Sequence, residues 1–399
     1  MGRLSFATAW VSFTLLGAPL AWSGEPECTG WQPAQKVGTL SIDAVDESSG
    51  LAASWLRADL IWTHNDSGDT ARLFALRTDG EVLTELTLTG AGSVDWEDMA
   101  IAACAPDDAA PCIYVADIGD NNARREHVSI YRFAEPDLGT PAVASLVIDQ
   151  FEELRFTYAG GPRDAETLLV HPQTGAIYIV EKNATGQSQV FRVAPRFGEA
   201  GVVAEPIATL HFDHLVAFGR MTTGGDVSPD GREFTLRTYT DLYTYCAPSA
   251  EAFEAAFQAT PIVSAQRPLT IQGEALTYDR QDNALWLTSE QLPAPLLRVP
   301  RQERVEPDPS QADPEPDAPD ATPISGLDAN ASPDDFDVQT DTTTAQDIAP
   351  AISDNANSSS CSCAMLSSSR RANLALFFVT ASLLVLGRRG PRPPRAVRQ

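Results

Sequence analysis

The sequence predicts an all-β fold, a β-propeller of five or six four-stranded blades, on the strength of three observations. Between residues 37 and 300, short β-branched and aromatic runs alternate with turns rich in Gly, Pro, Asp and Asn. A unit of such runs recurs with first runs that start at residues 49, 97, 166, 225 and 274. The last unit stops after its third run, and Val37–Ile42 can supply the missing outer strand and close the ring.

Each unit continues in the same order after its first run. The second runs are 61–64, 113–116, 177–180, 234–237 and 285–288, and the third runs are 73–76, 130–133, 190–193, 242–245 and 296–299. A fourth run follows in most units, for example after the hairpin turn at Asp79-Gly80. Five units are visible, and a degenerate sixth could lie in 141–160 or 205–218. One helix is expected, at 250–258.

The two ends of the chain differ in composition from the repeats. Residues 1–23 contain Arg3, an apolar run and small residues before a cleavage point, which predicts a signal peptide, with an uncleaved anchor as the alternative. The propeller domain then covers 24–304. Residues 305–360 are acidic and rich in Pro, which predicts a disordered spacer. Residues 361–399 contain two cysteines, a short apolar run and a basic tail, which predicts a sorting or membrane-anchor segment.

Charge and cysteine content narrow the possible partners and the compartment. The 399 residues carry a formal net charge of −26, which argues against a nucleic-acid partner. Export permits disulfides among Cys28, Cys104, Cys112 and Cys246. Cys104 and Cys112 bracket a short loop between two antiparallel strands, so they can face each other and leave Cys28 for Cys246. Three pairings of four cysteines are formally possible.

Strand direction places the polar ends of the repeats on one face. The start of each first strand and the end of the antiparallel second strand meet there, around the central channel. Crowded carboxylates repel one another unless a cation lies among them, and Ca²⁺ takes six to eight such oxygens. The predicted Ca²⁺ ligands are Asp95, Glu97, Asp98, Asp117, Asp120, Asn121, Asn122, Glu166 and Glu181. The predicted ligand-binding residues are Asn65, Asp66, Arg125, Arg237, Tyr239, Glu274 and Glu290.

A structural role for these residues is the alternative. Asp and Asn at blade starts often cap turns and bind backbone amides between blades. The arginines can also neutralise neighbouring carboxylates instead of binding an anionic ligand.

Several of these motifs together resemble a known group of proteins. They are Trp62–Asp66, Asp95–Asp98, Asp117–Asn122, Thr223–Gly231 and Gly273–Ala275. Over about 37–300 the chain resembles secreted bacterial propellers similar to SdiA-regulated and phytase-esterase-like proteins. That resemblance implies Ca²⁺ on this face. The last forty or so residues resemble the myxobacterial-type C-terminal sorting tail (MYXO-CTERM), which implies processing near the cysteines and retention at the cell surface.

The expected function is therefore that of an exported propeller, anchored to the cell envelope through its C-terminus, that binds an extracellular ligand or surface partner on a Ca²⁺-occupied face. The chain has no Gly-x-Ser-x-Gly nucleophile motif, which favours this binding role. The alternative is a Ca²⁺-dependent phosphoester or ester hydrolase in which Glu97 or Glu166 activates water. A third possibility is a purely structural component of the surface layer.

Overall fold

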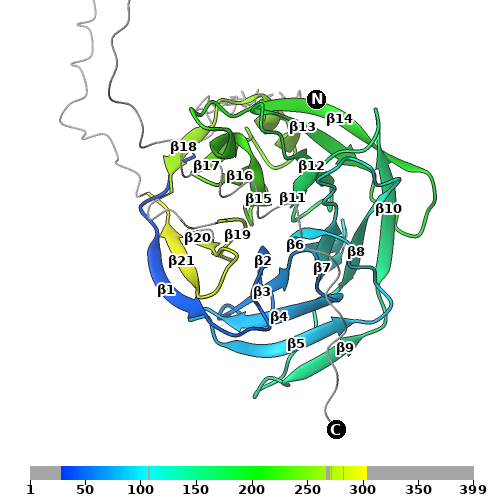
Figure 1. Ribbon diagram of the computed structural model, residues 1–399, viewed down its shortest axis with the longest axis vertical. Helices are drawn as coiled ribbons and strands as arrows, with labels where there is room; N and C mark the ends of the chain where they lie inside the picture. Colours follow the sequence, from blue (N-terminus) through cyan, green and yellow to red (C-terminus); the bar gives the residue numbers. More distant parts are fainter. Residues whose placement is uncertain (1–27, 107, 267–269, 271, 282, 303–399) are drawn as a thin grey trace, which may run out of the picture. The chain divides into compact units, whose positions relative to one another are not determined.

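The computed structural model describes residues 28–106, 108–266, 270, 272–281 and 283–302 (Figure 1). The predicted signal peptide (1–23), spacer (305–360) and C-terminal segment (361–399) lie outside these residues. Within the described ranges, no helix is both long and apolar enough to cross a membrane.

The described chain folds into five blades, and in the first four the strands run in sequence from an inner strand outward (Figure 1). The first blade contains β2 (Ser48–Ala53), β3 (Leu60–Asn65), β4 (Arg72–Arg77) and β5 (Val82–Leu88). The second contains β6 (Trp96–Ala105), β7 (Asp108–Asp117), β8 (Val128–Ala134) and β10 (Glu152–Tyr158). The third contains β11 (Ala165–Val170), β12 (Ile177–Glu181), β13 (Gln187–Val193) and β14 (Val202–His211).

The last two blades complete the ring. The fourth contains β15 (Thr222–Val227), β16 (Glu233–Thr238), β17 (Asp241–Cys246) and β18 (Ile262–Ala265). The fifth contains β19 (Leu276–Tyr278), β20 (Ala284–Leu287), β21 (Ala294–Pro300) and, as its outer strand, β1 (Gln35–Leu40). β1 pairs antiparallel with β21, so the predicted closure by the N-terminal strand is confirmed. Each inner strand lies against the inner strands of the two neighbouring blades.

The two segments that could have hidden a sixth blade are used as edges of other blades. β9 (Ser145–Ile148) pairs parallel with β5 of the first blade, and β10 is the outer strand of the second. β14 is the outer strand of the third blade, and it pairs parallel with β10. These pairings cover exposed sheet edges and join the second and third blades into one eight-stranded sheet. The expected helix is a short 3₁₀ helix, η2 (Phe253–Gln258), and a second, η1 (Ala217–Arg220), precedes β15.

The core lies between the faces of neighbouring blades. Inner strands such as β11 are buried at every position, whereas the outer strand β10 alternates buried and exposed residues. Five apolar clusters fill the described protein, and each of them joins two consecutive blades. The cluster between the fifth and first blades includes Leu40 of β1, so the N-terminal strand takes part in the core that closes the ring.

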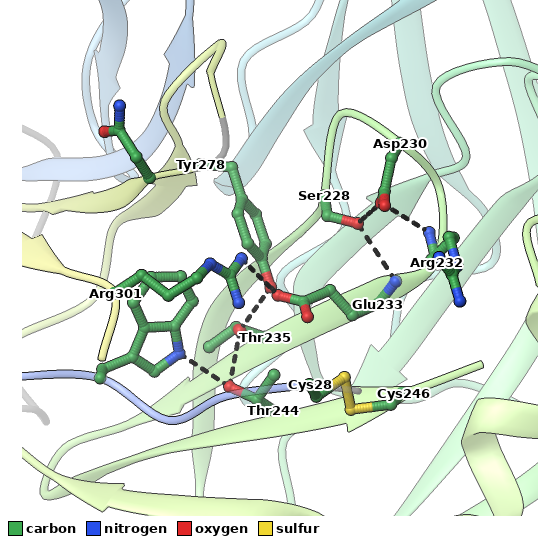
Figure 2. A network of polar contacts seen from close by, with 12 residues as sticks. Cys28, Ser228, Asp230, Arg232, Glu233, Thr235, Thr244, Cys246, Tyr278 and Arg301 are labelled. Atoms are coloured by element: carbon green, nitrogen blue, oxygen red, sulfur yellow. Dashed lines mark hydrogen bonds and ion pairs between the residues drawn. A yellow bond between two sulfur atoms is a disulfide. The ribbon is translucent and has the colours of Figure 1, made fainter. Parts of the chain in front are cut away.

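The segment before β1 is fastened to the fourth blade. The disulfide Cys28–Cys246 joins it to the end of β17 with the Cα atoms 6.1 Å apart, and Trp31 Nε1 donates to Thr244 Oγ1 at 2.8 Å. Figure 2 shows the polar network next to this disulfide, in which Glu233 of β16 accepts hydrogen bonds from Arg301 and Tyr278. The second disulfide, Cys104–Cys112, links β6 to β7. Both predicted pairings are confirmed.

The inner strand of the fourth blade differs most from its predicted start. The sequence placed the start of the fourth blade's first run at residue 225, but β15 begins at Thr222. Asp226 therefore lies near the far end of this strand, where its carboxylate accepts hydrogen bonds from Val227 N, Thr277 Oγ1 and Tyr278 N. The start of β15 thus brings no carboxylate to the face where the other inner strands begin.

Candidate functional site

A β-bulge recurs at the start of four inner strands. The pairing between inner and second strand shifts by one residue between Ser48 and Gly50, Trp96 and Asp98, Ala165 and Thr167, and Thr222 and Gly224. The extra residues are Ser49, Glu97, Glu166 and Thr223. A bulge re-aims the side chain of the extra residue. Because inner strands begin where second strands end, all four bulges lie on the predicted face.

Two of these bulges carry hydroxyl groups that bind the neighbouring blade. Ser49 Oγ donates to the carbonyl oxygen of Glu97 at 2.7 Å, and Thr223 Oγ1 donates to the carbonyl oxygen of Gly273 at 3.0 Å. Both side chains are buried. The bulge of the first blade therefore fastens its inner strand to β6, and the bulge of the fourth blade fastens its inner strand to the segment just before β19.

The other two bulges carry carboxylates. Glu97 is 3% exposed and Glu166 is 4% exposed. Glu166 Oε1 forms an ion pair with Lys182, which directly follows β12, whereas Glu166 Oε2 is buried with no hydrogen-bond partner in the described structure. Burial raises the pKa of Glu166 to about 8, and the charge of Lys182 opposes this rise.

Three carboxylates converge beside Lys182. One oxygen from each of Asp66, Asp95 and Glu97 lies within 4.8 Å of the other two. Asp66 Oδ1 is buried, and no described group bonds to it. Burial, reinforced by neighbouring negative charge, raises the pKa of Asp66 and of Glu97 well above the usual range. Burial also raises the pKa of Asp95 to about 6.

A glycine makes this convergence possible. A Cβ atom on Gly119 would overlap with Glu97 Oε1 and Asp95 Oδ2. The glycine in the predicted ligand loop 117–122 therefore serves close packing of the carboxylates.

The fourth and fifth blades complete the rim. Tyr239 Oη donates to Glu274 Oε1 at 3.1 Å, and the ring of Tyr239 lies 5.7 Å from Lys182 Nζ. Gln272 Nε2 donates to Glu290 Oε2 at 2.8 Å, and burial raises the pKa of Glu290 to about 7. These groups act electrostatically on one another and form what we call the acidic mouth: Asp66, Asp95, Glu97, Glu166, Lys182, Tyr239, Glu274 and Glu290.

Several predicted Ca²⁺ ligands instead use their oxygens to brace the backbone. Asp98 accepts hydrogen bonds from Met99 N, Leu168 N and Gly225 N, which links three inner strands. Asp117 accepts from Val94 N and Asp95 N and forms an ion pair with Arg125 at 2.7 Å. Asp120 accepts from Arg124 N and Arg125 N, and Glu181 accepts from Gln189 N. Asn121 and Asn122 are exposed.

Two predicted ligand-binding residues are structural as well. Arg237 is fully buried, and its guanidinium donates to the carbonyl oxygens of Ala275 and Thr288 and to the side chains of Gln266 and Thr270. This guanidinium joins the fourth and fifth blades beneath the surface, and the role predicted for it in ligand binding stays a prediction. Asn65 accepts from Glu47 N and donates to the carbonyl oxygen of Ala44.

The position of a residue at the end of the second strand decides whether it braces the backbone or belongs to the acidic mouth. Asn65 and Glu181 end their strands and brace the backbone, and the residues that follow them, Asp66 and Lys182, belong to the acidic mouth. Tyr239 follows the last residue of β16 in the same way. Lys182 was not among the predicted site residues, although its place after Glu181 matches that of Asp66 after Asn65.

Comparison with known proteins shows distant similarities in fold. No family model matches the chain, and no curated protein matches its sequence. The fold is similar to that of a gluconolactonase from Xanthomonas campestris, with 14% identity, a TM-score of 0.39 and coverage of 71% of this chain and 99% of the other. A protein described as a putative oxidoreductase (glucose dehydrogenase) from Thermus thermophilus gives 11% identity, a TM-score of 0.36 and coverage of 68% and 100%.

Proposed function

We propose that the acidic mouth binds a divalent cation, Ca²⁺, and that the loaded face binds an extracellular ligand or surface partner. The convergence of Asp66, Asp95 and Glu97 carries this proposal, because carboxylate oxygens within 4.8 Å of one another repel unless a proton or a cation lies among them. Hard cations prefer such oxygens, and Ca²⁺ tolerates irregular arrangements of them.

The charge balance of the mouth supports a bound cation. Six carboxylates contribute to it, namely Asp66, Asp95, Glu97, Glu166, Glu274 and Glu290, and Lys182 is its one basic member. Lys182 already pairs with Glu166. Asp66 Oδ1 and Glu166 Oε2 are buried acceptors without a described donor, and a metal ion would satisfy such oxygens.

Calorimetric titration of EDTA-treated, full-length protein with CaCl₂ tests the proposal. We expect saturable binding and a rise in melting temperature, with weaker binding of Mg²⁺ because Mg²⁺ demands near-octahedral geometry. The control variant Glu81→Gln should bind Ca²⁺ as the wild type does, since this carboxylate is 63% exposed on the turn between β4 and β5. If the addition of Ca²⁺ produces no binding heat and no change in melting temperature, the metal site is ruled out.

A second candidate is a Ca²⁺-dependent phosphoester or ester hydrolase, and one observation favours it. Glu166 has a buried oxygen without a partner and lies next to the Glu97 carboxylate and the Lys182 ammonium. A bound cation would supply an activated water, Glu166 could take up its proton, and Lys182 could stabilise negative charge on the substrate. The motif resemblance to phytase-esterase-like propellers agrees with this candidate.

Turnover measurements separate the two candidates. A hydrolase should cleave a p-nitrophenyl phosphate or ester in the presence of Ca²⁺ and lose activity on addition of EDTA. Glu166→Gln should remove turnover while the variant stays folded and still binds Ca²⁺ in calorimetric titration. Ca²⁺ binding without turnover of any substrate in the panel favours the binding role.

We also propose that the propeller is exported and held at the cell surface by its C-terminal segment. The disulfides Cys28–Cys246 and Cys104–Cys112 support an oxidising compartment, which agrees with the signal-peptide pattern at the N-terminus. Removal of residues 361–399, which resemble a MYXO-CTERM tail, should release the protein into the medium. Retention in the cytoplasm would contradict export.

A further inference from the structure

A separate cavity of about 250 Å³ lies where the second and third blades meet. Its walls come from the loop after β7, the start of β8, the end of β10 and the loop before β11. Val128 and Phe156 provide apolar surface, and Arg125, Tyr158 and Arg163 provide polar groups. Pockets that enclose drug-sized ligands measure roughly 300–1,000 Å³, so this cavity suits a smaller molecule.

Hydrogen-bond donors in this wall lack acceptors. Tyr158 is 6% exposed, and its hydroxyl is buried with no partner in the described protein. Burial raises the pKa of Tyr158, which keeps this hydroxyl protonated. Arg163 Nε is likewise buried and unpartnered, and Arg163 Nη1 lies 3.6 Å from Glu181, which is beyond a normal hydrogen bond. Buried donors without acceptors are uncommon in folded proteins.

Three nearby carboxylates accept hydrogen bonds from the backbone. Asp120 accepts from Arg124 N and Arg125 N, and Asp164 Oδ1 accepts from Asp120 N at 3.1 Å. Glu181 Oε2 accepts from Gln189 N. The cavity wall therefore holds donors without acceptors, and two carboxylates also line it: Asp120, whose Oδ2 accepts both backbone N–H groups, and the exposed Glu126.

Arg125 adds a partly satisfied guanidinium. Its Nη1 contacts Asp117 and the carbonyl oxygen of Gly119, and its Nε and Nη2 have no partner among the residues described. Asp117 also accepts a hydrogen bond from Asp95 N, so Arg125 connects this cavity with the edge of the acidic mouth. A ligand in the cavity would thus lie beside the mouth without needing to enter it.

We propose that this cavity is a subsite for an oxyanion, either a carboxylate or a phosphate group of a small ligand, held by Arg125, Arg163 and the hydroxyl of Tyr158. Guanidinium groups match both oxyanions, and the charged oxygens of each can accept the hydrogen bonds that the unpartnered donors offer. Val128 and Phe156 then contact the apolar part of the ligand. The subsite is independent of the proposed Ca²⁺ site, since none of its donors is a metal ligand.

Titration of full-length protein in EDTA tests the subsite, with inorganic phosphate and benzoate as separate probes. We expect saturable binding of at least one probe, with a dissociation constant below about 10 mM. Binding of phosphate alone assigns a phosphate group, and binding of benzoate alone assigns a carboxylate. Arg163→Gln should weaken binding about tenfold, and Tyr158→Phe, which keeps the packed ring, about threefold.

Arg155→Gln is the matched control, because Arg155 lies on β10 but is 57% exposed, pairs with Glu153 and does not line the cavity. Its affinity for the probes should equal that of the wild type. The subsite is wrong if neither probe binds, or if Arg163→Gln and Tyr158→Phe bind as tightly as the wild type. Binding that appears only after Ca²⁺ is added would place the anion on the metal and also overturn the proposal.

Discussion

The bulges of the first and fourth blades and those of the second and third share one backbone geometry but differ in their side chains. Ser49 and Thr223 are short and can donate, so each binds a carbonyl oxygen of the next blade. Glu97 and Glu166 carry longer side chains that, when ionised, only accept, so they cannot make that bond. Their carboxylates reach the acidic mouth instead.

This difference shows how one repeated position supports both the fold and the chemistry. The hydroxyl bulges join neighbouring blades, and the carboxylate bulges place buried charge among Asp66, Asp95 and Lys182. Substitutions at the two kinds of bulge should therefore affect different properties: stability at the hydroxyls, and cation binding and pH response at the carboxylates.

The largest effect is expected where a carboxylate bulge loses its counter-charge. Lys182→Met leaves Glu166 buried without its ion pair, which should destabilise the metal-free protein by about 3 to 5 kcal/mol. Ca²⁺ should bind more tightly than in the wild type, because a competing positive charge is gone. Urea denaturation in EDTA and Ca²⁺ titration measure the two effects. Unchanged stability in EDTA would mean that the pair with Glu166 contributes little.

Substitution of one residue at each kind of bulge tests whether the carboxylate and hydroxyl bulges have separate roles. Glu97→Gln should weaken Ca²⁺ binding by about a hundredfold, because one of three converging carboxylates is lost. It should not destabilise the metal-free protein, since it removes repulsion. Ser49→Ala should leave the Ca²⁺ affinity within about twofold of the wild type. Equal losses of affinity in the two variants, measured by calorimetry, would contradict separate roles.

The carboxylates of the mouth should make stability depend on pH. The pKa is raised from 3.8 to about 6 for Asp95, from 4.5 to about 7 for Glu290 and from 4.5 to about 8 for Glu166. The folded state thus holds protons that the unfolded state releases, so stability of the metal-free protein falls as pH rises from about 4 to 8. Melting temperatures in EDTA measure this fall. Saturating Ca²⁺ should reduce it, and an equal slope with and without Ca²⁺ would argue against cation binding here.

Removal of the hydroxyl group at a bulge should have the smallest effect on stability. Ser49→Ala and Thr223→Val each remove one buried hydrogen bond between blades, at a cost of about 1 to 2 kcal/mol. Chemical denaturation of the Ca²⁺-loaded variants measures this cost, and their Ca²⁺ affinity serves as the internal control. A variant as stable as the wild type would show that water replaces the lost donor.

The fold follows from the sequence because it depends on patterns that repeat. Turn residues and β-branched runs mark the blades, and the missing outer strand of the last unit pointed to closure by the N-terminal strand, as β1 and β21 confirm. The loop between Cys104 and Cys112 allowed both disulfides to be assigned. The start of the fourth blade's inner strand was predicted three residues too late, because Thr222–Gly224 carries no charge that would mark it.

The candidate site could be predicted only to the level of a face. Asp95, Glu97 and Asp98 look alike in the sequence, and a bulge between Trp96 and Asp98 determines which of them lie at the mouth and which braces the backbone. A bulge depends on pairing with the next strand, so no local pattern marks it. The cavity at Tyr158 and Arg163 escaped prediction for a similar reason, since it forms between loops of two blades.

A crystal structure of the protein grown with Ca²⁺ is the most direct test of the proposed site. We predict one ion in contact with oxygens of Asp66, Asp95 and Glu97 at roughly 2.3 to 2.6 Å, with the hydroxyls of Ser49 and Thr223 still bound to the neighbouring blades. Anomalous scattering would identify the ion. A mouth that holds only water at millimolar Ca²⁺, with the three carboxylates still together, would contradict the account.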